Sequence, residues 1–193
     1  GTTSGSAYIF VRDGTSWSQQ AKLTASDAAQ YDRFGQDVAM YGDYVIIGAY
    51  GNDDNGSSSG SAYIFVRDGT SWSQQAKLTA NDGAADDNFG FGVGIYGDYA
   101  IVGANGDDGV LMTESGSAYI FVRDGTSWSQ QAKLTASDAA QNDSFGRVVG
   151  IYGDYAIVGA MYNDDNGTNS GSAYIFVRDG TSWSQQAKLT ASD

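Results

Sequence analysis

The sequence predicts an all-β fold built from a repeated unit of about 55 residues. The block GSAYIFVRDGTSWSQQAKLTA occurs four times, and its copies begin at Gly5, Gly60, Gly116 and Gly171. Within the repeat, apolar residues alternate with the period of two that is typical of strands, and glycine breaks recur every few residues. The acidic residues are almost all aspartate, with Glu114 the one glutamate. Because aspartate favours turns over helices, the composition also favours strands joined by turns.

Each full repeat is expected to contain four strands. In the first repeat the expected strands are Phe34–Tyr41, Tyr44–Ala49, Ser61–Arg67 and Trp72–Ala80. Only Gly42 and Asp43 separate the first strand from the second, which indicates a two-residue hairpin. A second tight turn joins the third strand to the fourth. Four strands per repeat, repeated radially, are typical of a β-propeller in which each repeat forms one blade.

The alternation of side chains predicts where the third and fourth strands lie. Both faces of the third strand are largely apolar, with Ala62, Ile64 and Val66 on one face and Tyr63, Phe65 and Arg67 on the other. This pattern is typical of a strand packed between neighbouring sheets. The fourth strand is expected to be an outer strand with one polar and one apolar face. We expect Ser73, Gln75, Lys77 and Thr79 on its polar face, and Trp72, Ala76 and Leu78 on its apolar face.

The repeat pattern divides the chain into a hairpin and three complete blades. Residues 1–27 form an orphan hairpin of third- and fourth-strand type, and the blades occupy residues 28–82, 83–138 and 139–193. Propellers usually have four to eight blades, so three blades do not form a usual ring. Three explanations stay open: the chain is part of a longer array, several copies complete one ring, or copies join head to tail in a filament. We therefore expect self-association.

Paired motifs in each repeat resemble a known family. Phe34-Gly35, Phe89-Gly90 and Phe145-Gly146 are each followed by an apolar strand that ends in Gly48-Ala49, Gly103-Ala104 or Gly159-Ala160. This pattern is similar to FG-GAP repeats, the blades of the integrin α-subunit propeller and of many bacterial surface proteins, and the bacterial proteins are the closer in style. The resemblance implies a non-catalytic adhesion or ligand-binding module outside the cell or on its surface.

One feature of integrin blades has no counterpart in this chain. The resemblance would place a long calcium loop between the first and second strands of a blade. The connections there are only Gly42-Asp43, Gly97-Asp98 and Gly153-Asp154. The calcium site of the integrin family is therefore not expected at its usual position.

The composition excludes several classes of function. The chain has no cysteine and no histidine, which excludes thiolate nucleophiles, cysteine-ligated zinc and Ser-His-Asp triads. We therefore expect no enzyme. A net charge of −13 argues against nucleic-acid binding, which requires a basic surface. No apolar run approaches the roughly 20 residues of a membrane span, so we expect no membrane insertion.

The longer loops are expected on one face of the blades, where they carry the candidate sites. The candidate metal ligands are Asn52, Asp53, Asp54, Asn55, Asp107, Asp108, Asn163, Asp164, Asp165 and Asn166. Oxygen ligands of this kind favour Ca²⁺, but asparagine, aspartate and glycine also form ordinary turns, and both interpretations stay open. The candidate ligand-binding residues in the same loops are Tyr50, Asp32, Arg33, Asp86, Asp87, Asp143 and Tyr162. The aspartates before each Phe-Gly pair could instead cap a turn.

These observations lead to one functional prediction and two alternatives. The prediction is a cell-surface adhesion module that recognises a protein or a glycan through its acidic loops. The first alternative is a structural repeat that polymerises into a surface filament or sheath. The second alternative is a lectin-like propeller, in which Tyr50 and Tyr162 stack on sugar rings.

Overall fold

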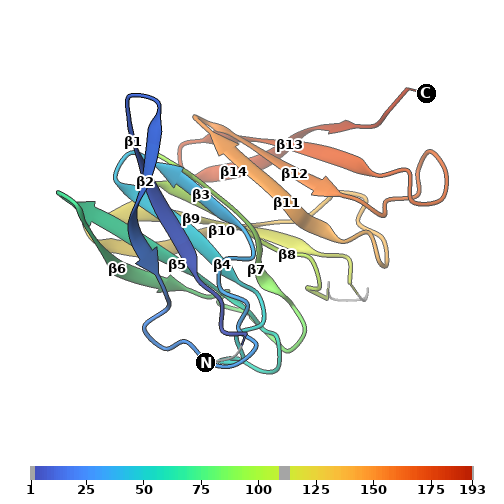
Figure 1. The fold of residues 1–193 in the computed structure, drawn as a ribbon. Helices are drawn as coiled ribbons and strands as arrows, with labels where there is room; N and C mark the ends of the chain where they lie inside the picture. Colours follow the sequence, from blue (N-terminus) through green and yellow to red (C-terminus); the bar gives the residue numbers. More distant parts are fainter. Residues whose placement is uncertain (1–2, 109–113, 193) are drawn as a thin grey trace.

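The computed structural model describes residues 3–108 and 114–192, and these residues form fourteen strands and no helix (Figure 1). The N-terminal hairpin consists of β1 (Ala7–Asp13) and β2 (Ser16–Leu23). Blade 1 consists of β3 (Val38–Tyr41), β4 (Tyr44–Ala49), β5 (Ser61–Asp68) and β6 (Ser71–Leu78). Blade 2 consists of β7 (Phe89–Tyr96), β8 (Tyr99–Ala104), β9 (Ser117–Asp124) and β10 (Ser127–Leu134). Blade 3 consists of β11 (Phe145–Tyr152), β12 (Tyr155–Ala160), β13 (Ser172–Asp179) and β14 (Ser182–Leu189).

Each blade is a four-stranded antiparallel sheet with its strands in chain order, while β1 and β2 form a sheet of their own. The register is the same in all three blades. For example, Ile46 pairs with Ile64 in blade 1, and Ile101 pairs with Ile120 in blade 2. The predicted all-β fold of propeller blades preceded by an orphan hairpin is confirmed.

The predicted strand bounds need correction at two places. In blade 1 the first strand begins at Val38 and not at Phe34, because the amides of Gly35 and Gln36 both donate to the carbonyl of Gly48, and the backbone bulges there. The fourth strand runs from Ser71 to Leu78, and so ends before Ala80.

The predicted faces of the fourth strand are also wrong in part. A β-bulge lies at Gln75, because Phe65 pairs with Gln74 while Ile64 pairs with Ala76. The extra residue reverses the alternation along the rest of the strand. As a result Trp72 packs toward the preceding hairpin, while Ala76 and Leu78 pack toward blade 2. The fourth strand is therefore apolar on both faces, and each face contacts a different neighbour.

The core consists of three apolar clusters, each between two consecutive sheets. The phenylalanine of each Phe-Gly pair lies at the centre of a cluster. Phe89 is fully buried, and its ring centroid lies 5.5 Å from that of Tyr119 and 5.9 Å from that of Phe121. Phe34 and Phe145 make the same pair of contacts in their own blades. The Phe-Gly motif is therefore first of all a packing motif.

The second glycine motif allows consecutive blades to approach closely. A Cβ atom on Gly48 would lie 1.9 Å from the carbonyl oxygen of Gly90, and one on Gly103 would lie 1.8 Å from that of Gly146. At Gly159 in blade 3, the nearest atom would be 3.7 Å away. Only glycine fits where one blade is followed by another, and Gly159 has no such neighbour among the described residues.

Candidate ligand-binding loop face

Connections alternate between the two ends of each blade, so the longer loops gather at one end, which we call the loop face. The loop face is formed by residues 24–37, 50–60, 79–88, 105–108, 114–116, 135–144 and 161–171. Residues 109–113, which include the predicted turn glycine Gly109, lie outside the described residues. The opposite end, the turn face, carries the short hairpin turns.

Repeated ion pairs neutralise part of the negative charge on the turn face. An arginine at the end of each third strand pairs with the aspartate of the first hairpin turn in the same blade. These pairs are Arg67 with Asp43, Arg123 with Asp98, and Arg178 with Asp154. The loop face instead holds all the candidate acidic residues, so the negative charge of the chain is concentrated there.

A lysine of the fourth strand neutralises part of this charge in every blade. In blade 2, Lys133 Nζ lies 2.7 Å from Asp82 Oδ2 and 3.0 Å from Asp107 Oδ2, and it lies over the Tyr119 ring at 5.3 Å. Lys77 makes the same kind of cluster with Asp27 and Asp54. Burial alone would lower the pKa of Lys77, but its two carboxylate partners outweigh burial and raise it. These lysines therefore stay charged and hold two loops together.

Blade 3 repeats the lysine cluster with one difference. Lys188 pairs with Asp138 at 2.6 Å and also with Asp165. The Tyr63 hydroxyl in blade 1 donates to Asp27, and the Tyr119 hydroxyl in blade 2 donates to Asp107, whereas the buried Tyr174 hydroxyl makes no hydrogen bond of normal geometry with the described residues. Burial raises the pKa of Tyr174 to about 12, so the hydroxyl stays protonated.

The candidate metal ligands are largely occupied by contacts within their own loops. Asn52 is buried and accepts the Ser61 hydroxyl at 2.9 Å, and Asn163 accepts the Ser172 hydroxyl at 2.7 Å. Asp53 and Asp164 accept backbone amides five residues ahead. The amides of Asn55 and Asn166 donate to serine hydroxyls, and the Asp108 carboxylate accepts the amide of Glu114.

Within the described ranges the side chains form no group of three or more carboxylates that could hold a metal ion. The oxygens predicted to bind Ca²⁺ are spread between turn contacts and lysine pairs. The calcium site thus stays a prediction, and binding would require the loops to give up some of these contacts.

The aspartate two residues before each Phe-Gly pair caps a turn. Asp32 accepts the amide of Ala29 and Asp87 accepts that of Ala84, both at 2.7 Å, and Asp143 accepts that of Ala140 at 3.1 Å. All three aspartates are buried. Their neighbours Arg33 and Asp86 are exposed and have positive φ angles. The buried aspartates therefore shape the loops, and the exposed residues beside them are available to a ligand.

The middle repeat differs from the others at one buried position. Asp107 stands where the other blades have Asn52 and Asn163, and it accepts the equivalent serine hydroxyl, from Ser117, at 3.0 Å. Burial, and after it the charge of Asp107, raises the pKa of Asp87 to about 6. In blade 3 the Asn163 amide instead donates to Asp143 at 3.2 Å. Asp107 thus adds a second buried carboxylate at a place where the other two blades have an amide.

We predict that Asp87→Asn weakens the pH dependence of stability. The folded-state pKa of Asp87 lies above its ordinary value, so this residue stabilises the fold at low pH, and that contribution is lost as the pH rises from about 4 through about 6. Between these two pH values the free energy of unfolding of the wild-type protein is expected to fall by about 1–3 kcal/mol more than that of Asp87→Asn. Urea unfolding across this pH range measures the difference.

Asp143→Asn is the matched control, because it changes the same turn cap in a blade that has no counterpart of Asp107. Equal pH dependence in wild type and Asp87→Asn would contradict the prediction. Asp107→Asn restores the residue of the other blades and is expected to reproduce part of the effect.

A polar hollow of about 340 Å³ lies on the loop face of blade 3. Its lining comprises Gln141, Asn142, Tyr162, Asp164 and Asn169. Blades 1 and 2 have Gly51 and Gly106 at the position of Tyr162, and a Cβ atom on either would lie within 2.2 Å of a backbone carbonyl. The wider loop arrangement of blade 3 therefore both accepts Tyr162 and leaves the hollow beside it.

The structure places the other candidate tyrosine in a different setting. Tyr50 lies against the Phe91 ring at 5.1 Å, and the Arg33 guanidinium lies 5.5 Å from the Tyr50 ring. Tyr50 is partly buried, whereas Tyr162 is exposed beside the hollow. Of the two tyrosines, Tyr162 is the better placed to stack on a ligand.

The residues that organise the loop face were not among the sequence-based candidates. These are the lysines of the fourth strands and the aspartates that follow the repeated block, namely Lys77, Lys133, Lys188, Asp27, Asp82 and Asp138. Each of these aspartates stands at the same distance after the block, a regularity that could have indicated a structural role. The strand pattern instead predicts that the lysines face solvent.

Comparison with known families agrees with this architecture. A model of the FG-GAP repeat matches residues 17–65, 72–121 and 128–176, which together make up more than half of the chain. The chain belongs to the FG-GAP repeat family. Each matched segment of the FG-GAP chain begins in the last strand of one sheet (β2, β6 or β10) and ends in the third strand of the next blade, so it includes the interface between two consecutive sheets. A search of curated proteins gave no match.

Among the described residues of this FG-GAP chain, no helix is long and apolar enough to cross a membrane. FG-GAP repeats are typical of extracellular proteins and form propeller modules that are in general not enzymes. The coarse features predicted from the sequence are thus supported by the family, while ligand and location are matters of proposal.

Proposed function

We propose that this FG-GAP chain is a non-catalytic adhesion module, outside the cell or on its surface, that recognises a glycan or a protein through its loop face. One observation carries the proposal. The third and fourth strands of the blades are identical in sequence and the second strands nearly so, whereas the loops on one face differ from blade to blade. Loops on a rigid scaffold are the usual site of recognition.

The geometry supports a rigid binding surface on this face. The lysines of the fourth strands and the capping aspartates hold the loops through side-chain contacts, so little ordering would be needed when a ligand binds. The hollow beside Tyr162 combines amide, carboxylate and aromatic groups, which are suited to a hydroxyl-rich ring. A glycan is therefore the ligand class that we would test first, with the hollow of blade 3 as its site.

We predict that Tyr162→Gly weakens glycan binding by about tenfold, because it removes the aromatic stacking surface. Glycine is the residue that blades 1 and 2 have at this position, so the loop is expected to fold. A glycan array identifies the ligand, and calorimetry then compares wild type, Tyr162→Gly and the turn-face control Asp124→Asn. Arrays and pull-downs should be run with calcium and with a chelator.

Three results would each have a clear meaning. Equal binding by wild type and Tyr162→Gly would contradict the blade 3 site. Arrays and pull-downs that both stay blank with and without calcium would contradict the adhesion module itself. Binding that is lost only in chelator would support the calcium prediction for Asp53, Asp54, Asp164 and Asp165.

The free ends of the array favour a second candidate function. A structural repeat that assembles into a filament or sheath would use the same blades as packing units. The apolar faces exposed at both ends of the chain motivate this candidate. A monodisperse small particle at all protein concentrations would argue against it.

A further inference from the structure

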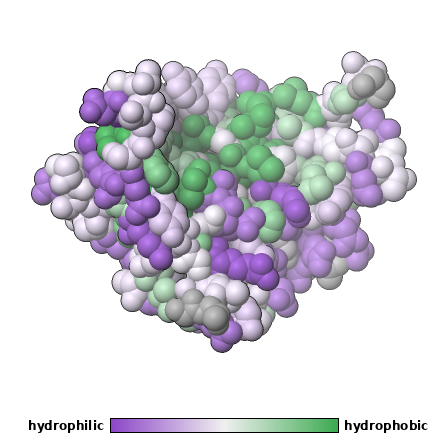
Figure 2. All heavy atoms as spheres, viewed as in Figure 1, coloured by the Kyte–Doolittle hydropathy of each residue, from purple (hydrophilic) through white to green (hydrophobic). Residues whose placement is uncertain are grey.

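Both ends of the blade array expose apolar residues that are buried where two blades meet. At the N-terminal end, Val38 is 53% exposed, whereas the equivalent Val93 is 4% exposed. At the C-terminal end, Ile157 is 44% exposed, whereas the equivalent Ile101 is fully buried. Figure 2 shows apolar surface gathered over β11 and β12 and in the hollow beside the β1–β2 hairpin. The two ends are therefore the two halves of one blade–blade interface.

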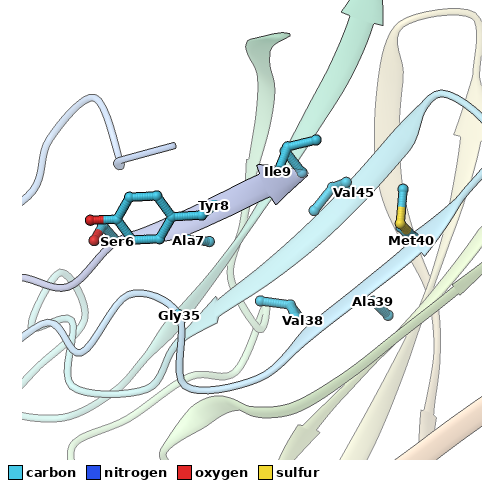
Figure 3. Close-up of a pocket in the computed structure, with 9 residues that line it drawn as sticks. All are labelled: Ser6, Ala7, Tyr8, Ile9, Gly35, Val38, Ala39, Met40 and Val45. Carbon is cyan, nitrogen blue, oxygen red and sulfur yellow. The ribbon is translucent and has the colours of Figure 1, made fainter. Parts of the chain in front are cut away.

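At the N-terminal end the hairpin covers only the outer half of blade 1. Strands β5, β9 and β13 each pair on both edges, whereas β1, which has the same sequence, pairs with β2 alone. Beside the free edge of β1 lies an apolar groove of about 400 Å³, in which Ile9 lies near Val45, with Val38 and Met40 along β3 (Figure 3). The groove occupies the position that the inner strands of a preceding blade would cover.

At the C-terminal end, blade 3 presents a complete but uncovered face. The hairpin residues Tyr152 and Tyr155 are 73% and 52% exposed. In the middle blade the equivalent Tyr96 contacts the Tyr152 ring at a tilted angle, and Tyr99 contacts both Trp183 and Arg178. A Cβ atom on Gly159 would make only an ordinary contact, 3.7 Å from the carbonyl oxygen of Val148, although the same glycine in blades 1 and 2 contacts the backbone of the next blade. Blade 3 therefore keeps the residues of an interface that the described part of the chain leaves uncovered.

We propose that copies of this chain join head to tail, and that blade 3 of one copy docks on blade 1 of the next, in the place of the β1–β2 hairpin. Residues 5–25 and 171–191 are identical. Strands β13 and β14 of one copy can thus replace β1 and β2 of its neighbour and pack in the same way. Strands β11 and β12 then fill the apolar groove, which the hairpin cannot do.

Burial of apolar residues is the interaction expected to drive this exchange. When the hairpin is released, β13 and β14 take over its packing on the outer half of blade 1. The packing energy lost by the hairpin and that gained by β13 and β14 cancel, because the two segments have the same sequence. The net stabilisation comes from burial of the inner residues, which include Val38, Met40, Tyr155 and Ile157. The tethered hairpin competes intramolecularly, so the exchange requires high protein concentration. Repulsion between copies of charge −13 opposes it, and salt is expected to promote it.

Two substitutions are expected to shift this association in opposite directions. A Cβ atom on Gly5 would lie 2.0 Å from the carbonyl oxygen of Phe34, so Gly5→Ala loosens the competing hairpin. A Cβ atom on Gly159 meets nothing closer than 3.7 Å within the chain, but would collide with the Phe-Gly backbone of a docked copy. We expect Gly5→Ala to associate at about tenfold lower protein concentration than wild type, and Gly159→Ala to stay monomeric.

Sedimentation velocity over a wide range of protein concentration at moderate and high salt measures this association. Limited trypsin digestion provides a second readout. Arg12 and Lys22 are already exposed in the docked hairpin, and cleavage at both is expected to be faster in the assembled fraction, where the hairpin is no longer held on blade 1. The inference is overturned if wild type stays monomeric throughout, if Gly159→Ala associates as wild type does, or if Gly5→Ala does not strengthen association. None of these results depends on the ligand of the loop face, so the two proposals can fail separately.

Discussion

Replacing Gly103 by alanine is expected to lower the free energy of unfolding by about 3 kcal/mol or more. The new Cβ atom would lie 1.8 Å from the carbonyl oxygen of Gly146, and this contact joins the backbones of blades 2 and 3. Neither backbone can move far, because each belongs to a paired strand, so the two blades must separate. Urea denaturation at a protein concentration where the chain is monomeric measures the loss.

Gly159→Ala is the matched control for this substitution. Both glycines lie in the sequence Tyr-Ala-Ile-Val-Gly-Ala, and both occupy the second strand of a blade. Because Gly159 has open space around it, alanine there is expected to change the free energy of unfolding by less than about 0.5 kcal/mol, or to stabilise the chain slightly. A similar loss at both positions would contradict the close blade–blade approach described here.

Trp128→Ala is expected to destabilise the chain by about 2–3 kcal/mol. Trp128 packs on blade 1, where its Nε1 donates to Gln75 Oε1 at 2.9 Å and its ring meets Tyr44 edge to face at 6.4 Å. Truncation leaves a cavity between two blades and removes the donor to Gln75. Repeat arrays depend on contacts between nearest neighbours, so we also expect a broader unfolding transition.

Trp17→Ala provides the control, since Trp17 lies in an identical block of sequence. Trp17 is 65% exposed, because no sheet of the described residues precedes the hairpin. Its truncation is expected to lower the free energy of unfolding of the monomer by less than about 0.5 kcal/mol. A loss at Trp17 equal to that at Trp128 would show that the hairpin is covered in the monomer, which is contrary to this structure.

The strands and their grouping into blades could be predicted from the sequence because the signals are local. Gly42-Asp43 and its counterparts fix the hairpins, and apolar residues with a period of two mark the strands. The Phe-Gly and Gly-Ala motifs occur together in each repeat for a physical reason. Phenylalanine fills the space between sheets, and glycine permits their backbones to meet.

The bulge at Gln75 could not be predicted, since nothing in Gln74-Gln75 distinguishes an extra residue from a regular one. The bulge places Trp72 and Leu78 on opposite faces of the fourth strand, so the strand packs against a neighbouring sheet on each face. The short first strand of blade 1 could not be predicted for a related reason. Its departure from the ladder depends on the carbonyl of Gly48, which is a contact between strands and not a local preference.

The loop face was predictable in position but not in its internal contacts. Alternation of connections places the acidic loops together, as predicted. Which carboxylates meet a lysine depends on how a loop between two blades folds over the next blade, so the pairing of Lys77 with both Asp27 and Asp54 could be known only from the structure. The interaction between Asp87 and Asp107 could not be predicted either. Asp107 replaces the asparagine of the other two blades, and Asp87 lies in a different loop.

Amide hydrogen exchange along the four identical blocks would test most directly whether position in the array determines the stability of each block. The blocks, residues 5–25, 60–80, 116–136 and 171–191, share one sequence, so any difference in protection reflects their neighbours. Peptides that extend into the unlike flanking loops distinguish them. We predict the strongest protection in residues 60–80 and 116–136, which have a sheet on both sides, weaker protection in 171–191, and the weakest in 5–25. Equal protection of all four blocks in the monomer would contradict an array with two open ends.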